Sequence, residues 1–146
     1  MGSSSMIEEV RALVDRKLPL VSNLSNVSAL LNTLDDLNWC GFYLAKDDVL
    51  YLGPFQGEVA CTVIPFGRGV CGEAAKTKQT RIVGNVLEYA NHIACSSRSR
   101  SEIVVPIIKC DKVVGVIDLD SPKFNRFNME DKIMLEEIAK ILSELF

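Results

Sequence analysis

Several features that mark exported, membrane-bound or nucleic-acid-binding proteins are missing from this sequence of 146 residues. No uninterrupted apolar run approaches the roughly 20 residues that a membrane-spanning helix needs. The N-terminus lacks the basic and apolar regions of a signal peptide, so we expect a cytoplasmic protein. Positive charge is not in excess, because the formal net charge is -3. The sequence therefore gives no electrostatic reason to expect nucleic acid or a membrane surface as a partner.

Patterns that bind metals or nucleotides are also scarce. The chain has one histidine and no CxxC pair. The glycine-rich stretch 66–72 has neither the Walker nor the Rossmann spacing, so it is a weak candidate for a phosphate loop. The ligand types of a zinc site are present in Cys61, Cys71, His92 and Cys95, and such a site stays open as an alternative.

Cysteine, in contrast, is plentiful, with five residues in the chain. An odd number of cysteines without an export signal favours reduced thiols over a disulfide framework. The hydrophobic fraction of 48% and the mean hydropathy of +0.18 predict a well-buried globular domain. We interpret residues 1–5 as the remnant of a tag and residues 6–146 as a single domain.

Hydrophobic periodicity predicts an α+β fold, in which an antiparallel sheet is flanked by helices at both ends of the chain. Helical spacing occurs near both termini, and Asn128 is a suitable N-cap for the last helix. A short helix follows the glycine-rich stretch at residues 73–78. Strands are expected at 38–44, 49–53, 59–66, 79–83, 102–108 and 112–120.

The candidate functional residues fall between Cys61 and Asp120. Cys61, Cys71 and Cys95 stand in turn-like or polar settings, and a strand-like run ends on Asp118 and Asp120. Paired carboxylates at the end of an apolar strand indicate a task or a partner. Cysteines and acids together suggest thiol chemistry on a small, charged substrate. On local grounds Cys71 is the best-activated thiol, because the positive end of the following helix lowers the pKa of a cysteine there.

Strand parity makes a testable prediction about a third acid, Glu102. Alternation places Val114, Val116, Asp118 and Asp120 on one face of their strand. A regular hairpin with a two-residue loop would pair Glu102 with Leu119, on the opposite face. A three-residue loop or a β-bulge would instead pair Glu102 with Asp120 and bring all the acids to one face.

The aromatic strand 38–44 also has two faces. Trp39, Gly41 and Tyr43 share one of them, and Cys40 lies on the other with Phe42 and Leu44. Cys40 is therefore interpreted as a small core residue. Trp39 is either a core residue or the wall of a substrate pocket.

Six motifs stand in order along the chain after Leu24: NWCGFYL, LGPFQG, IPFGRGVCG, HIAC, SEIVVP and GVIDLDS. Together they closely resemble the free methionine-(R)-sulfoxide reductases, which are GAF-domain enzymes. Two departures are visible. Ser96 stands where the family usually has an acid after the HIAC cysteine, and Cys40 replaces a small residue of the pattern.

The resemblance implies a role for each candidate residue. It makes Cys95 the nucleophile, Cys61 the resolving cysteine and Cys71 a third redox-linked thiol, against the local argument for Cys71. It implies that no cofactor is bound and that thioredoxin or another dithiol reduces the enzyme. Glu102 and Asp120 become candidates for the oxygen side of the substrate and Asp118 for its ammonium group. Trp39, with Tyr43 as a weaker candidate, becomes the wall around the terminal methyl.

Two questions stay open at this point. A GAF sensor module that binds a small ligand without turning it over is the alternative from another functional class. The terminal helices of this fold class often pair, so a homodimer is a further expectation.

Overall fold

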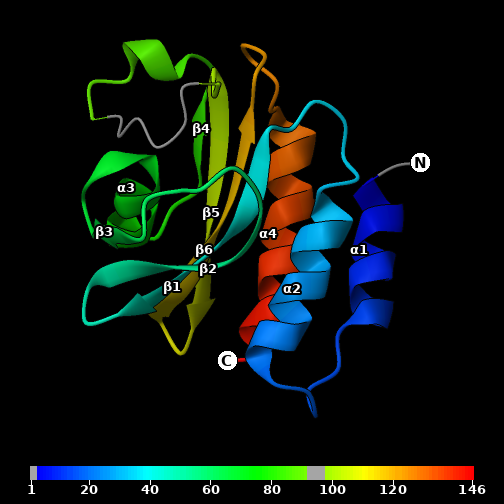
Figure 1. The fold of residues 1–146 in the computed structure, drawn as a ribbon. Coiled ribbons are helices and arrows are strands. Elements are labelled where there is room, and N and C mark those ends of the chain that lie inside the picture. The colour runs from blue at the N-terminus through cyan, green and yellow to red at the C-terminus, as the bar shows by residue number, and fades with distance from the viewer. Residues whose placement is uncertain (1–2, 92–97) are drawn as a thin grey trace.

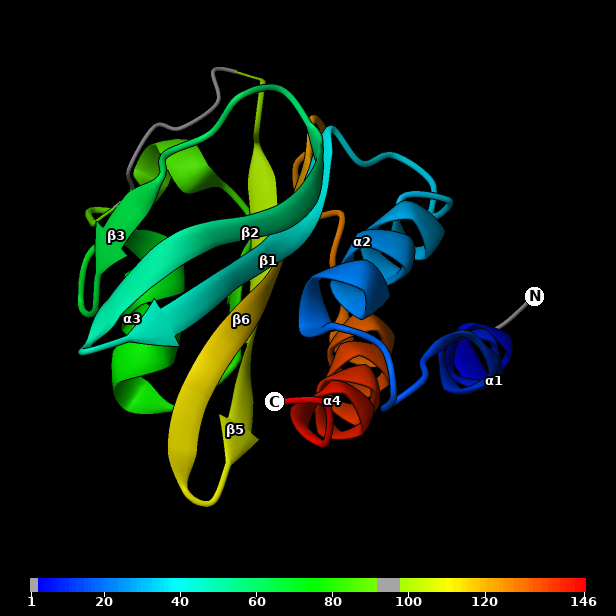
Figure 2. The same cartoon turned by 60° about the horizontal axis from the view of Figure 1, so that its bottom comes forward.

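The computed structural model describes residues 3–91 and 98–146 of the chain. Its six strands form one antiparallel sheet in the order β3-β2-β1-β6-β5-β4. The helices α2 and α4 cover one face of this sheet, α1 packs against these two helices, and α3 lies on the other face (Figures 1 and 2). The predicted α+β architecture is confirmed. The strands are β1 (Trp39–Lys46), β2 (Val49–Gly57), β3 (Val63–Pro65), β4 (Arg81–Val83), β5 (Ser101–Lys109) and β6 (Lys112–Ser121).

Local sequence signals account for several of the helix boundaries. The α-helices are α1 (Ser3–Leu13), α2 (Leu20–Leu31), α3 (Gly69–Thr77) and α4 (Met129–Ser143), with a short 3-10 helix η1 (Val86–Glu88). Asn128 caps α4 as predicted, because its side chain accepts a hydrogen bond from the backbone of Asp131 and the Asp131 side chain accepts one in return. This reciprocal pair satisfies amide groups that would otherwise lack a partner at the start of the helix.

The hairpin of β5 and β6 contains the bulge on which the face of Glu102 depends. Lys109 pairs with Lys112, so the loop has two residues, Cys110 and Asp111, both with positive φ. The register then shifts between Ile107 and Ile108, which oppose Gly115 and Val113 and leave Val114 without a partner in the ladder. As a result, Glu102 lies opposite Asp120. The bulge alternative is therefore the one that the structure contains.

The same bulge makes the predicted position of Val114 wrong. Val114 packs against the core under α1, α2 and α4, whereas Val116 belongs to the cluster under α3. An extra residue in one strand reverses the alternation on one side of the bulge, so Val114 and Val116 cannot share a face.

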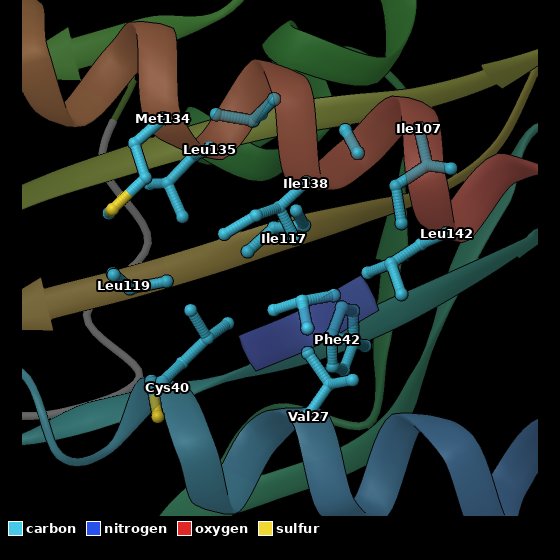
Figure 3. Packing of buried hydrophobic residues seen from close by; sticks show 14 of the residues in the cluster. Val27, Cys40, Phe42, Ile107, Ile117, Leu119, Met134, Leu135, Ile138 and Leu142 are labelled. Atoms are coloured by element: carbon cyan, nitrogen blue, oxygen red, sulfur yellow. The ribbon is translucent and has the colours of Figure 1, made fainter. Parts of the chain in front are cut away.

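The larger core lies between the sheet and its layer of three helices. Phe42, Ile117 and Leu119 point from the sheet toward Val27 of α2 and Leu135 of α4 (Figure 3). Cys40 belongs to this core and is fully buried, as predicted, and its thiol donates to the carbonyl of Ser28 at 3.3 Å. Burial raises the pKa of Cys40 to about 12, and the charges of Asp118 and Asp120 add to the effect. Such a thiol stays protonated and acts as a packing residue.

Two elements differ from their expected extents in ways that matter for the cysteines. The strand predicted at 59–66 is shortened to Val63–Pro65, so Cys61 lies before it in an irregular segment. The carbonyl of Cys61 accepts a hydrogen bond from the Tyr43 hydroxyl at 2.9 Å, in place of one from a neighbouring strand. Helix α3 begins at Gly69, earlier than predicted, and its first turn therefore includes Cys71.

Candidate active site

Three neighbouring strands contribute one row of side chains to the α3 side of the sheet. Asp120 of β6 lies opposite Glu102 of β5 and, across its other edge, opposite Trp39 of β1. Asp118 is on the same face, two residues before Asp120 in β6. Glu102 and Asp118 are buried, and Asp120 is partly exposed. The structure thus brings together four of the five residues that the sequence proposed for substrate contact, in an order set by strand pairing, and the fifth, Tyr43, stacks on Trp39.

The acids of this row hold protons more strongly than exposed carboxyl groups do. Burial raises the pKa of Glu102, and the charge of Asp118 raises it further. Burial also raises the pKa of Asp118, with Asp120 as the next cause, and that of Asp120, with Glu102 as the next cause. Neighbouring carboxyl groups out of water cannot all ionise at once. Such a row favours one carboxyl group that stays protonated beside another that is ionised.

Two oxygen atoms in the row are buried without a hydrogen-bond partner among the described residues, namely Oδ1 of Asp118 and Oδ1 of Asp120. A buried polar atom without a partner is costly and calls for an explanation. Two carboxylate oxygens on one face of a strand can accept hydrogen bonds from a cationic or N–H-bearing ligand. The acid row is thus suited to binding such a group and to donating a proton nearby.

The Cys71 thiol faces this row, at 4.0 Å from Oε2 of Glu102, to which it donates. Burial raises the pKa of Cys71 well above its usual value, and the charges of Asp118 and Glu102 add to the rise. The prediction that the helix terminus makes Cys71 the best-activated thiol is wrong. The dipole of α3 acts on a group surrounded by carboxyl groups and removed from water, and these effects outweigh it.

An aromatic stack borders the acid row at Trp39. Its indole stacks on Tyr43 at 6.0 Å between centroids and on Phe55 of β2 at 5.2 Å. The indole N–H donates to the carbonyl of Glu58 at 3.1 Å. Gly57, with φ of +139°, lies so close that a Cβ there would be 2.6 Å from the indole. Trp39 is buried, as a core residue would be, and it also lies opposite Asp120, where it could form the wall of a substrate pocket.

Cys61 lies beside the aromatic stack and is disulfide-bonded in the structure. The cysteines with free thiols among the described residues are Cys40, Cys71 and Cys110. The predicted nucleophile Cys95 falls outside the described residues, as do His92 and Ser96. A disulfide sulfur is not a thiolate ligand, so the zinc set that includes Cys61 is not formed in this state.

The chain is anchored on both sides of residues 92–97. On one side, Asn91 donates to the Gly67 carbonyl at 2.9 Å and to Glu73 of α3 at 2.8 Å, and Tyr89 donates to the same Glu73 carboxylate. On the other side, the buried Ser99 hydroxyl donates to Oδ2 of Asp120 at 3.0 Å. Asn91 and Tyr89 are thus tied to α3, and Ser99 is tied to the acid row.

Sequence reasoning missed two residues of the site. Phe55 was part of an LGPFQG motif but had no assigned place, and the strand β2 proves longer than the expected 49–53, which brings Phe55 to Trp39. Ser99 stood in a polar run that we interpreted as surface. Arg98 fits that interpretation, since it is exposed and forms an ion pair with Glu58 at 3.5 Å, whereas Ser101 of the same run is buried in β5. Nothing local distinguishes Ser99 from the other serines of the run.

One described group has the spacing of a metal site. Ligand atoms of Cys71, Glu102 and Asp118 lie within 4.8 Å of one another. Burial raises the pKa of each of these residues, and this favours the protonated form of the Cys71 thiol. A protonated thiol is not a metal ligand, and we assign no metal here.

Comparison with known proteins identifies the family. The GAF domain family model matches residues 26–146. The free methionine-R-sulfoxide reductase of Saccharomyces cerevisiae is 48% identical over 141 residues, which cover 90% of this chain and 78% of that protein. The reductase of the same name from Escherichia coli is 44% identical, over 94% of this chain and 84% of that protein. This chain belongs to the free methionine-R-sulfoxide reductase family of GAF-domain proteins.

A solved structure from the free methionine-R-sulfoxide reductase family supports the same assignment. The Neisseria meningitidis enzyme, determined in complex with its substrate, superposes with a TM-score of 0.89 at 44% identity, over 99% of this chain and 85% of that one. Within the part of this chain that the structure describes, no helix is both long and apolar enough to cross a membrane.

Proposed function

We propose that this protein reduces free methionine-(R)-sulfoxide to methionine at the row formed by Trp39, Asp120, Asp118 and Glu102. The family membership supports the reaction, and the site supports it chemically. The observation that carries the proposal is that Glu102 and Asp120 are directly opposed on one face of the sheet. This pairing is what the proton transfer requires. A sensor module has no need of a disulfide-bonded cysteine on the α3 side of the sheet, where Cys61 contacts Tyr43, so the family and the chemistry both favour the enzyme.

In the proposed reaction, the thiolate of Cys95 attacks the sulfur of the sulfoxide while Glu102, paired with Asp120, protonates the oxygen. The oxygen passes to Cys95, which becomes a sulfenic acid, and methionine leaves. The thiol of Cys61 then attacks the sulfenic sulfur, water departs, and a disulfide forms. The disulfide at Cys61 is consistent with this step. Cys71, whose pKa is raised, remains a third thiol at the site that is not required as a nucleophile.

An external dithiol closes the cycle, and we propose thioredoxin for this role. Its thiolate attacks the disulfide, a mixed disulfide forms, and its second thiol releases the reduced enzyme. The electrons that reduce the sulfoxide therefore come from the dithiol, and no bound cofactor takes part. The net products are methionine, water and oxidised dithiol.

The acids also account for selection of the free amino acid. Asp118 is the proposed partner of the substrate ammonium, and its unpartnered Oδ1 supplies an acceptor. A methionine sulfoxide within a polypeptide has an amide in place of the ammonium, so burying it against a charged carboxyl group would lose an ion pair. Trp39, supported by Tyr43, would contact the methyl end of the substrate.

The deciding experiment is an assay of the R and S forms of methionine sulfoxide, each free and within a peptide, with dithiothreitol as reductant. We expect turnover of the free R form alone. If the free R form stays unreduced while the folded protein binds it, the sensor alternative is correct.

A further inference from the structure

We propose that Ser99 is a positioning residue for Asp120 and that Asn38 holds Ser99 in place. This inference deepens the proposed function and rests on it. It concerns the orientation of the carboxyl group that faces Glu102, which strand pairing alone does not fix.

The contacts form a short chain of hydrogen bonds. The side-chain amide of Asn38 donates to the Ser99 hydroxyl at 3.1 Å, and that hydroxyl donates to Oδ2 of Asp120 at 3.0 Å. The backbone N–H of Asn38 also donates to the carbonyl of Asp120 at 3.0 Å. Asn38 therefore holds both the main chain of Asp120 and, through Ser99, one oxygen of its side chain.

The geometry of a carboxyl group determines what this chain of bonds achieves. With Oδ2 occupied by Ser99, the plane of the carboxyl group is set, and Oδ1 is left as the acceptor without a partner. Ser99 is only 4% exposed, so water does not readily compete for its hydroxyl. A hydroxyl that donates to Oδ2 also favours the charged form of Asp120. Asp120 is then the fixed partner of Glu102 in the proposed proton transfer.

The position of Ser99 in the chain adds a second consequence. Ser99 lies in the irregular stretch just before β5, so its bond to Asp120 ties this stretch to the acid row. Losing this bond would release the Asp120 carboxyl group from its alignment with Glu102. A displacement of about 1 Å in such an alignment can cost about 100-fold in rate.

The test compares Ser99→Ala with Ser99→Thr in steady-state kinetics on free methionine-(R)-sulfoxide with dithiothreitol. We expect Ser99→Ala to lower kcat by about tenfold or more while KM stays within about twofold, because the substrate ammonium is bound by Asp118. Ser99→Thr keeps the hydroxyl and should recover most of kcat.

Ser101→Ala is the matched control. Ser101 is also buried, and its hydroxyl donates to the Lys123 carbonyl at 2.6 Å and accepts from the backbone N–H of Arg126 at 3.3 Å. It should lose thermal stability without the loss in kcat. If the wild type is active and Ser99→Ala has the same kcat and KM, the inference is wrong while the proposed function stands. The same follows if the kcat of Ser99→Thr is no higher than that of Ser99→Ala. A folded wild type that leaves the sulfoxide unreduced would overturn the proposed function and the inference together.

Discussion

Glu102 and Asp120 lie directly opposite each other in the ladder between β5 and β6. Residues that oppose each other across an antiparallel pair have side chains in contact range on the same face. Burial raises the pKa of both carboxyl groups; the charge of Asp118 raises that of Glu102 further, and the charge of Glu102 raises that of Asp120. Two such neighbouring acids tend to hold one proton between them. Strand pairing thus builds a proton donor from two ordinary acids.

Replacing Glu102 by Gln should lower kcat by about 100-fold or more, because the amide cannot supply the proton. In the wild type, kcat should fall as the pH rises through the raised pKa of the acid pair, since the protonated form is the active one. Rate measurements across pH would show this alkaline limb, and it should be absent from Glu102→Gln. A limb that persists unchanged in the variant would remove Glu102 from the proton transfer.

Replacing Asp118 by Asn should raise KM strongly and stabilise the fold at neutral pH. The folded-state pKa of Asp118 is raised, so the folded protein binds more protons than the unfolded chain once the pH exceeds about 4, the ordinary value for Asp. Its contribution to stability is therefore greatest below that pH and is lost as the pH rises toward the folded-state pKa. Asn avoids this loss.

Urea unfolding at two pH values would measure the effect of Asp118→Asn. We expect a gain of about 1 kcal/mol at pH 7 and a much smaller difference near pH 4. If the variant is less stable than the wild type, and by the same amount at pH 7 and pH 4, the assignment of a raised pKa to Asp118 is wrong.

The buried thiols should resist alkylation. The pKa of Cys71 is raised, that of Cys40 is about 12, and both are buried, whereas Cys110 is exposed at the hairpin tip. Treatment with iodoacetamide near pH 7.5 should label Cys110 and spare the other two, because the thiolate is the reactive form. Mass spectrometry of digested protein would locate the label, with urea-unfolded protein as the control. Rapid labelling of Cys71 in the folded protein would show that it is activated after all.

Replacing Cys95 by Ser should abolish turnover, because a hydroxyl does not replace the thiolate in attack on the sulfoxide sulfur. Cys110→Ser is the control, since that thiol is exposed and lies at a turn outside the acid row. Activity surviving in Cys95→Ser would assign the nucleophile to another cysteine.

The sequence predicted which side chains of β6 share a face near Asp118 and Asp120, but it did not predict the location of the bulge. Alternation follows from backbone geometry, so Asp118 and Asp120 had to share a face. The bulge falls in a run of valines, where Val113 and Val114 are equally suited to either face, and the local sequence offers no preference. A shared site for Asp118, Asp120 and Glu102 implied one extra residue in the hairpin. Its position at Val114 follows only from the strand pairing.

The environment of Cys71 shows a different limit. Its place at the start of a helix was readable from the glycines that precede it, and the helix dipole is a local effect. The acids that control its pKa come from β5 and β6, about 30 to 50 residues later in the chain. Only tertiary structure brings them together, and burial then outweighs the dipole. Ser99 was missed for the same reason, because its partners Asn38 and Asp120 are distant in sequence.

The exposed tip of the β5–β6 hairpin provides a site for chemical attachment. Cys110 sits there with a positive φ and an accessible thiol, beyond the bulge from the acid row. A dye or a maleimide linker attached at this point would leave the catalytic groups untouched. The protein could thus be attached to an electrode or bead in one orientation while Cys61 is disulfide-bonded, then reduced with a dithiol and used to monitor sulfoxide in solution.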